Sequence, residues 1–152
     1  MADARAVTGS DSLRTVGLGS CVGVALYDAR AAVAGLAHIM LPDSRGDAGA
    51  TPAKYADSGI ALLLQLMQAQ GAKRNQIVAK LAGGAQMFTV AGRKDYARIG
   101  PRNVEAVEAV LVSARIPVVS RAVGGHKGRT IELYAQDGSL TVRCADVQAI
   151  TI

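Results

Sequence analysis

The predicted fold and the candidate chemistry both depend on one stretch, Thr15-Val16-Gly17-Leu18-Gly19-Ser20-Cys21-Val22-Gly23-Val24. Its glycines predict a corner in the chain, and the apolar residues after Cys21 predict a strand that is buried on both faces. The corner therefore delivers a cysteine into an apolar strand. A second apolar run, at residues 33–40, follows and carries His38, one of only two histidines.

These two runs, at residues 21–28 and 33–40, predict an antiparallel hairpin. In the expected register Gly23 pairs with His38, and Cys21 lies diagonal to His38 on the same face, within reach of a long side chain. Because Gly23 has no side chain, we expect the space beneath the imidazole to be empty. A slip of one residue would put the cysteine and the histidine on opposite faces.

A cysteine beside a histidine can be held as a thiolate–imidazolium pair that attacks a carbonyl carbon. The backbone N–H groups of the corner, around Gly19 and Ser20, are candidates to stabilise the oxyanion that forms. The hydroxyl of Thr15, at the start of the same corner, is a candidate to orient the base. The sequence thus predicts a nucleophile–base pair, Cys21 and His38, with Thr15 behind it.

Each of these features also has a structural interpretation. Cys21 can be a core cysteine, and His38 can be a core histidine bonded to a carbonyl. The glycines can serve only to let strands cross. A phosphate-binding loop is disfavoured because no Gly-Lys-Ser/Thr ending and no helix follow the glycines. Two cysteines and two histidines at scattered positions do not predict a zinc site, and neither a metal nor a cofactor is expected.

Length and composition predict a single domain over residues 1–152, with a polar, poorly ordered end at residues 1–12. The formal charge is +5, yet the basic residues are scattered and no aromatic residues interleave with them, so we expect an acidic protein surface rather than nucleic acid as partner. No apolar run approaches the ~20 residues that span a bilayer. Two cysteines do not make a disulfide framework, which fits a reduced cytoplasmic setting, and we expect a monomer.

The remaining pattern predicts an α+β fold, a mixed β-sandwich with helices packed on it. Thr51 and Pro52 are expected to begin a helix that Gly71 ends, and a second helix is expected over about residues 101–114. A basic loop is expected over residues 91–100. Further strands are expected at residues 13–18, 77–82, 118–123, 129–134 and 140–144, the last two joined by an Asp-Gly turn.

The motifs also resemble those of a known family, the CheD chemoreceptor glutamine deamidases. The most specific match combines Gly-Leu-Gly-Ser-Cys at residues 17–21 with His-Ile-Met-Leu-Pro at residues 38–42. The likeness continues in the family's order and spans about residues 14 to 135. Its other segments are residues 54–57, 80–88, 99–104, 123–125 and 128–129.

The resemblance implies a cysteine-hydrolase fold with a catalytic set of Cys21, His38 and Thr15. It implies hydrolysis of selected glutamines, on cytoplasmic helices of chemotaxis receptors, to glutamates. It also implies that a CheC-type phosphatase can bind and regulate the protein. The substrate-groove candidates lie in two basic segments: Arg98, Arg102, His126 and Arg129. A solvated charged face is the alternative for these four residues.

Two other functions fit the same residues. A peptidase or a transglutaminase-like acyl transferase would use the same nucleophile–base pair on another carbonyl compound. A regulatory adaptor that binds a receptor or a CheC-type phosphatase would need little turnover.

Overall fold

The computed structural model describes residues 2–47, 49–87, 98–145 and 147–152. Within these residues the chain forms nine strands and two α-helices. The strands are β1 (Ala4–Thr8), β2 (Ser12–Leu18), β3 (Val22–Asp28), β4 (Val33–Ile39), β5 (Ile77–Gly83), β6 (Val118–Val123), β7 (Arg129–Tyr134), β8 (Leu140–Cys144) and β9 (Ile150–Thr151). The helices are α1 (Ala56–Ala69) and α2 (Ile99–Ser113), with short 3-10 turns at Pro52–Lys54 and Arg74–Gln76.

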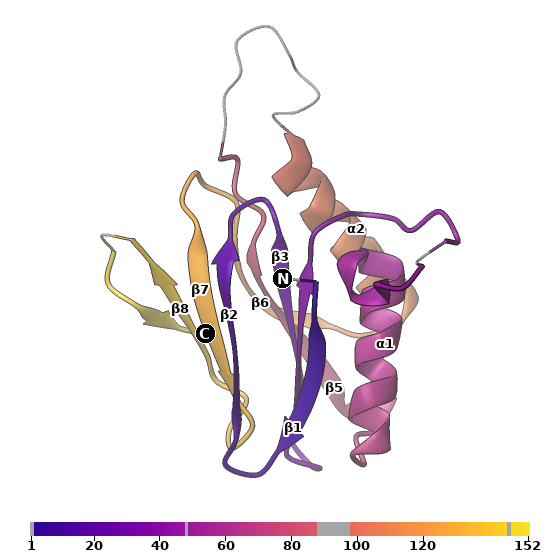
Figure 1. Cartoon of the computed structure of the whole chain (residues 1–152). Helices are drawn as coiled ribbons and strands as arrows, with labels where there is room; N and C mark the ends of the chain where they lie inside the picture. Colours follow the sequence, from indigo (N-terminus) through magenta and orange to yellow (C-terminus); the bar gives the residue numbers. More distant parts are fainter. Residues whose placement is uncertain (1, 48, 88–97, 146) are drawn as a thin grey trace, which may run out of the picture.

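The strands form two sheets, of which one has five strands in the order β1-β4-β3-β5-β6 and the other four in the order β2-β7-β8-β9. Among the strands of the described residues, β5 and β6 form the parallel pair, and α2 lies between them in the chain. The helices cover one face of the five-stranded sheet and the four-stranded sheet lies on the other (Figure 1). The predicted mixed β-sandwich with helices packed on it is confirmed.

The strand β3 lies at the centre of these layers. Its residues Val22, Val24 and Leu26 join the apolar core beneath the helices, whereas Ala25 faces the core between the sheets. Burial on both faces explains why the run lacks the polar alternation of a surface strand. The same alternation directs Gly23 and its partner on β4 into the space between the two sheets.

Two predictions about local structure are wrong. Within the segment expected to be poorly ordered, Ala4–Thr8 forms β1, because it pairs antiparallel with β4 and becomes an edge strand of the five-stranded sheet. The first α-helix begins at Ala56 rather than at Pro52. Pro52 begins a 3-10 turn instead, after which Tyr55 is extended and interrupts the helical path.

The basic loop expected at residues 91–100 lies outside the described residues as far as residue 97. In the described part of the chain, no helix combines the length and the apolar character that crossing a membrane requires.

Candidate active site

The register of the β3–β4 hairpin places His38 in the site. Gly23 pairs with His38, as the sequence predicts, and the imidazole points between the sheets. The space beside Gly23 is filled rather than empty, because a Cβ there would collide with the end of the Ile131 side chain and touch Leu18. The glycine is therefore needed because the opposite sheet packs directly against this part of β3.

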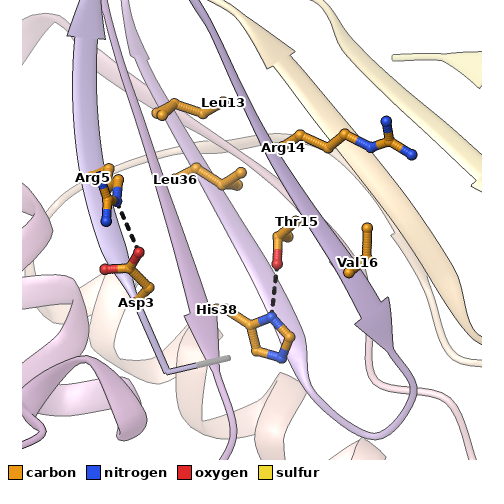
Figure 2. Close-up of a pocket in the computed structure, with 8 residues that line it drawn as sticks. All are labelled: Asp3, Arg5, Leu13, Arg14, Thr15, Val16, Leu36 and His38. Carbon is orange, nitrogen blue, oxygen red and sulfur yellow. Dashed lines mark hydrogen bonds and ion pairs between the residues drawn. The ribbon is translucent and has the colours of Figure 1, made fainter.

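The strand β2 of the opposite sheet brings Thr15 to the imidazole. Thr15 pairs with Ile131 on β7, and a break in register between Thr15 and Leu18 bends the end of the strand. The Thr15 hydroxyl lies 2.8 Å from His38 Nδ1, and Figure 2 shows the two groups pointing at one another. The bond leaves Nε2 as the nitrogen available for chemistry, and this buried atom has no hydrogen-bond partner among the described residues.

Cys21 lies in the corner, one residue before β3 begins. Its side chain is half-buried and packs against the core between the two sheets, which is the side that His38 faces. Backbone bonds fix the corner on β5 and the segment after it: the Gly84 N–H donates to the Cys21 carbonyl and the Ala85 N–H to the Gly19 carbonyl, both at 2.8 Å. The nucleophile candidate is therefore held by backbone on a rigid sheet.

Burial sets the charges of the pair. It raises the pKa of the Cys21 thiol, although the residue's own backbone N–H partly opposes this rise. Burial also lowers the pKa of the His38 imidazole. Both shifts favour the neutral forms of the two groups, a thiol and an imidazole, over the thiolate–imidazolium pair.

Asn103 is a site residue that the sequence reasoning missed. It lies in the first turns of α2, is fully buried, and donates from Nδ2 to the carbonyls of Ser20 and Met40, each at 2.9 Å. These carbonyls lie one residue before Cys21 and two residues after His38. The sequence carried two signals: residues 99–104 belong to the resemblance to CheD, and Asn103 is a polar residue on the face of α2 that also carries Val107 and Leu111.

Known proteins with similar sequences match the chain over almost all of its length. The model of the family described as "CheD chemotactic sensory transduction" matches residues 40–144. A chemoreceptor glutamine deamidase CheD of Halalkalibacterium halodurans is 52% identical over 145 residues, which cover 94% of this chain and 90% of that protein. The chain belongs to the CheD family.

Two further CheD relatives are named probable chemoreceptor glutamine deamidases. The protein of Geobacillus kaustophilus is 51% identical over 150 residues, covering 95% of this chain and 90% of its own length. The protein of Clostridium botulinum is 42% identical over 153 residues, covering 100% of this chain and 94% of its own length. The catalytic roles of Cys21, His38 and Thr15 stay predictions.

In this CheD-family chain the two candidates for oxyanion support differ in what their backbone already does. The Gly19 N–H donates to the Gly17 carbonyl at 3.0 Å, so it is engaged within the corner. The N–H groups of Ser20 and Cys21 donate to no other described residue. Of the three N–H groups compared, those of Ser20 and Cys21 can therefore donate to an oxyanion.

The four groove candidates lie in different surroundings. Arg98 is exposed at the start of α2, and Arg102 is exposed one turn later. His126 is exposed, with Nδ1 3.1 Å from the Gln86 carbonyl. Arg129 is instead bound inside the fold, because its guanidinium donates to the carbonyls of Gly83 at 3.1 Å and Gly124 at 2.7 Å.

A cavity of about 340 Å³ opens behind the Thr15–His38 pair (Figure 2). The Asp3–Arg5 ion pair lies on its β1 side, and Cys21 is not among its lining residues. The cavity therefore reaches the imidazole from the Thr15 side. No group of three or more His, Cys, Asp or Glu side chains within the described ranges is arranged to hold a metal ion.

Proposed function

We propose that this protein is a protein-glutamine deamidase that converts glutamines of chemoreceptors to glutamates, with Cys21 as nucleophile, His38 as base and Thr15 as the group that orients the base. The observation that carries the proposal is the 2.8 Å bond between Thr15 Oγ1 and His38 Nδ1, on the face toward which Cys21 packs. The names of the relatives supply the substrate class.

Because burial favours the neutral thiol and the neutral imidazole, the proposed reaction begins from these two forms. His38 Nε2 removes the thiol proton as Sγ attacks the glutamine carboxamide carbon, so attack and proton transfer occur together. The imidazolium then protonates the departing nitrogen, ammonia leaves, and a thioester to Cys21 remains. Water next attacks the thioester carbonyl while Nε2 takes its proton, and the thiol leaves with that proton as glutamate forms.

Thr15 acts through His38 in both halves of this cycle. Its hydroxyl can accept the Nδ1–H, which leaves a lone pair on Nε2 and steadies the imidazolium when it forms. The same proposal includes three further points. The substrate glutamines lie on cytoplasmic helices of the receptors, a CheC-type phosphatase binds the protein, and the protein is a monomer.

The test is a deamidation assay on a receptor cytoplasmic fragment, read by mass spectrometry for the change from NH₂ to OH and by release of ammonia. Cys21→Ala should lower the rate by several orders of magnitude, since it removes the nucleophile. Cys144→Ala is the matched control, because Cys144 is the other half-buried free cysteine and lies at the end of β8 in the four-stranded sheet. Its rate should equal that of the wild type.

The products separate this proposal from its rivals. Cleavage of the fragment's backbone would identify a peptidase, and incorporation of an added amine would identify an acyl transferase. Binding of the fragment without release of ammonia would identify an adaptor. Each of these results, or equal rates for Cys21→Ala and wild type, would overturn the proposed deamidase.

A further inference from the structure

The main-chain pairing of β3 with β4 includes His38 but ends before it reaches Cys21. The last pair of the β3–β4 ladder is Val22 with Ile39. Cys21 and Met40, the next residues outward, are not paired, and Met40 N–H donates instead to the Lys54 carbonyl at 2.9 Å. Main-chain pairing therefore ends one residue short of the cysteine.

The Asn103 side chain joins the two strands beyond this point. One amide nitrogen donates to the Ser20 carbonyl on the nucleophile side and to the Met40 carbonyl on the base side, both at 2.9 Å. Asn103 thus bridges the two strands at the point where a further main-chain pair, Cys21 with Met40, would otherwise form. Unlike such a pair, the bridging side chain is positioned by α2 and not by either strand.

The position of Asn103 is itself rigid. Gly100, one turn earlier on α2, lies so close to the carbonyls of Gly84 and Ala85 that a Cβ at this position would collide with both. The same two residues donate the backbone bonds that hold the corner around Cys21. The helix, the end of β5 and the corner thus form one tightly packed unit.

Asn103 also contains an unsatisfied atom. Its Oδ1 is buried and has no hydrogen-bond partner among the described residues. An unpaired buried acceptor is costly, and an apolar side chain of the same shape would avoid that cost if packing were all that the position required. The two bonds from Nδ2 are therefore the feature that accounts for an amide here.

The bond to Ser20 determines the orientation of a whole peptide group. Carbonyl and N–H point in opposite directions across a trans peptide plane, so turning the Ser20 carbonyl toward α2 turns the Cys21 N–H away from it. That N–H donates to no other described residue. Although burial raises the pKa of the Cys21 thiol, the residue's own N–H opposes this rise. An N–H group beside the attacking sulfur is well placed to receive the oxyanion.

We propose that Asn103 is a positioning residue, which ties the loop of Cys21 to the end of the His38 strand and holds the Cys21 N–H toward the reacting carbonyl oxygen. The oxyanion part of this inference rests on the proposed deamidase function. The part that concerns the cysteine does not, because the reactivity of the thiol can be measured without a protein substrate.

The experiment compares two substitutions at Asn103 with a control at the other end of β3. Asn103→Leu keeps the shape and removes both donors, whereas Asn103→Ser keeps one hydroxyl donor and leaves room for water beside the freed carbonyls. The control is Asp28→Asn, since Asp28 is also buried and also accepts bonds from backbone N–H groups, those of Arg30, Ala31 and Lys73. The unfolding temperature of each variant is measured first, so that kcat and thiol reactivity are compared between variants of equal stability.

Two readouts follow, both well below the unfolding temperature. For deamidation, Asn103→Leu should lower kcat roughly 100-fold with little change in KM, as expected when an oxyanion donor or the nucleophile is misplaced. For alkylation of Cys21 by a small neutral reagent, the midpoint of the pH–rate curve should move to higher pH, because the Cys21 N–H no longer faces the sulfur. Asn103→Ser should give smaller changes of the same sign, and Asp28→Asn should give neither.

The possible failures are distinguishable. Wild-type kcat and an unmoved alkylation midpoint in folded Asn103→Leu or Asn103→Ser would overturn the inference. So would an equal fall in kcat for Asp28→Asn at matched stability, because the effect would then be one of stability alone. A wild-type protein that releases no ammonia would refute the deamidase proposal instead, and the alkylation curves would then decide the role of Asn103.

Discussion

The bond from Thr15 to His38 allows a quantitative prediction. Thr15→Val keeps the branched shape of the side chain but removes the oxygen that lies 2.8 Å from Nδ1. A hydrogen bond between the hydroxyl and a neutral imidazole is worth about 0.5–1.5 kcal/mol, whereas a bond to the imidazolium is worth about 1.5–3 kcal/mol. The bond therefore strengthens by about 1–1.5 kcal/mol as the proton moves, so its loss should lower kcat roughly tenfold.

The imidazole also becomes freer to turn, because the Thr15 hydroxyl is the side-chain group that bonds Nδ1 and the described residues offer Nε2 no partner. We expect kcat for deamidation of a receptor fragment to fall ten- to a hundredfold, about the effect of misplacing a general base. Thr15→Ser keeps the hydroxyl and should recover most of the rate. Steady-state kinetics on both variants checks this. The reasoning would be refuted if Thr15→Val retained the wild-type kcat, or if Thr15→Ser lost as much activity as Thr15→Val.

Three further predictions concern the surroundings of the site. Gly83→Ala should lower the free energy of unfolding by about 1–3 kcal/mol in denaturant unfolding, because φ is +107° there and the new Cβ would meet the Cys21 carbonyl. The control is Gly9→Ala, at φ +70° in open space, which should lower the free energy of unfolding by less. Although burial alone would raise the pKa of Asp28, its backbone N–H donors lower it. Asp28→Asn should therefore destabilise the protein at neutral pH, and its stability should approach that of the wild type below about pH 3.8. A stability difference that did not vary with pH would contradict this. Arg98→Glu should slow association with an acidic receptor fragment in stopped-flow measurements, more at low salt than at high salt, and an effect independent of salt would favour a merely solvated arginine.

The hairpin could be predicted from sequence because its register depends on local information. Two apolar runs of equal length flank a short turn, and only one register buries both of them. That register pairs Gly23 with His38, as observed. The corner itself suggested Thr15, Gly19 and Ser20, whereas the resemblance to the CheD family supplied the glutamine substrate and the order of the motifs.

Other features of the site depend on contacts that no local pattern encodes. Ala4–Thr8 looks like a disordered end until β4 offers it a partner. Asn103 looks like an ordinary helical residue until α2 docks on the corner. The directions in which the pKa values of Cys21 and His38 shift likewise depend on how deeply the fold buries them, which composition and spacing do not reveal.

The connections around Cys21 have a consequence for the timing of synthesis. Thr15, Cys21 and His38 all leave the ribosome within the first quarter of the chain, but the contacts that hold their geometry come from Gly84, Asn103 and later residues. Contacts across such long stretches of chain form late in folding. A nascent or prematurely ended chain would therefore carry the thiol without the arrangement that the proposed reaction requires, and we expect deamidase activity only once the chain is nearly complete.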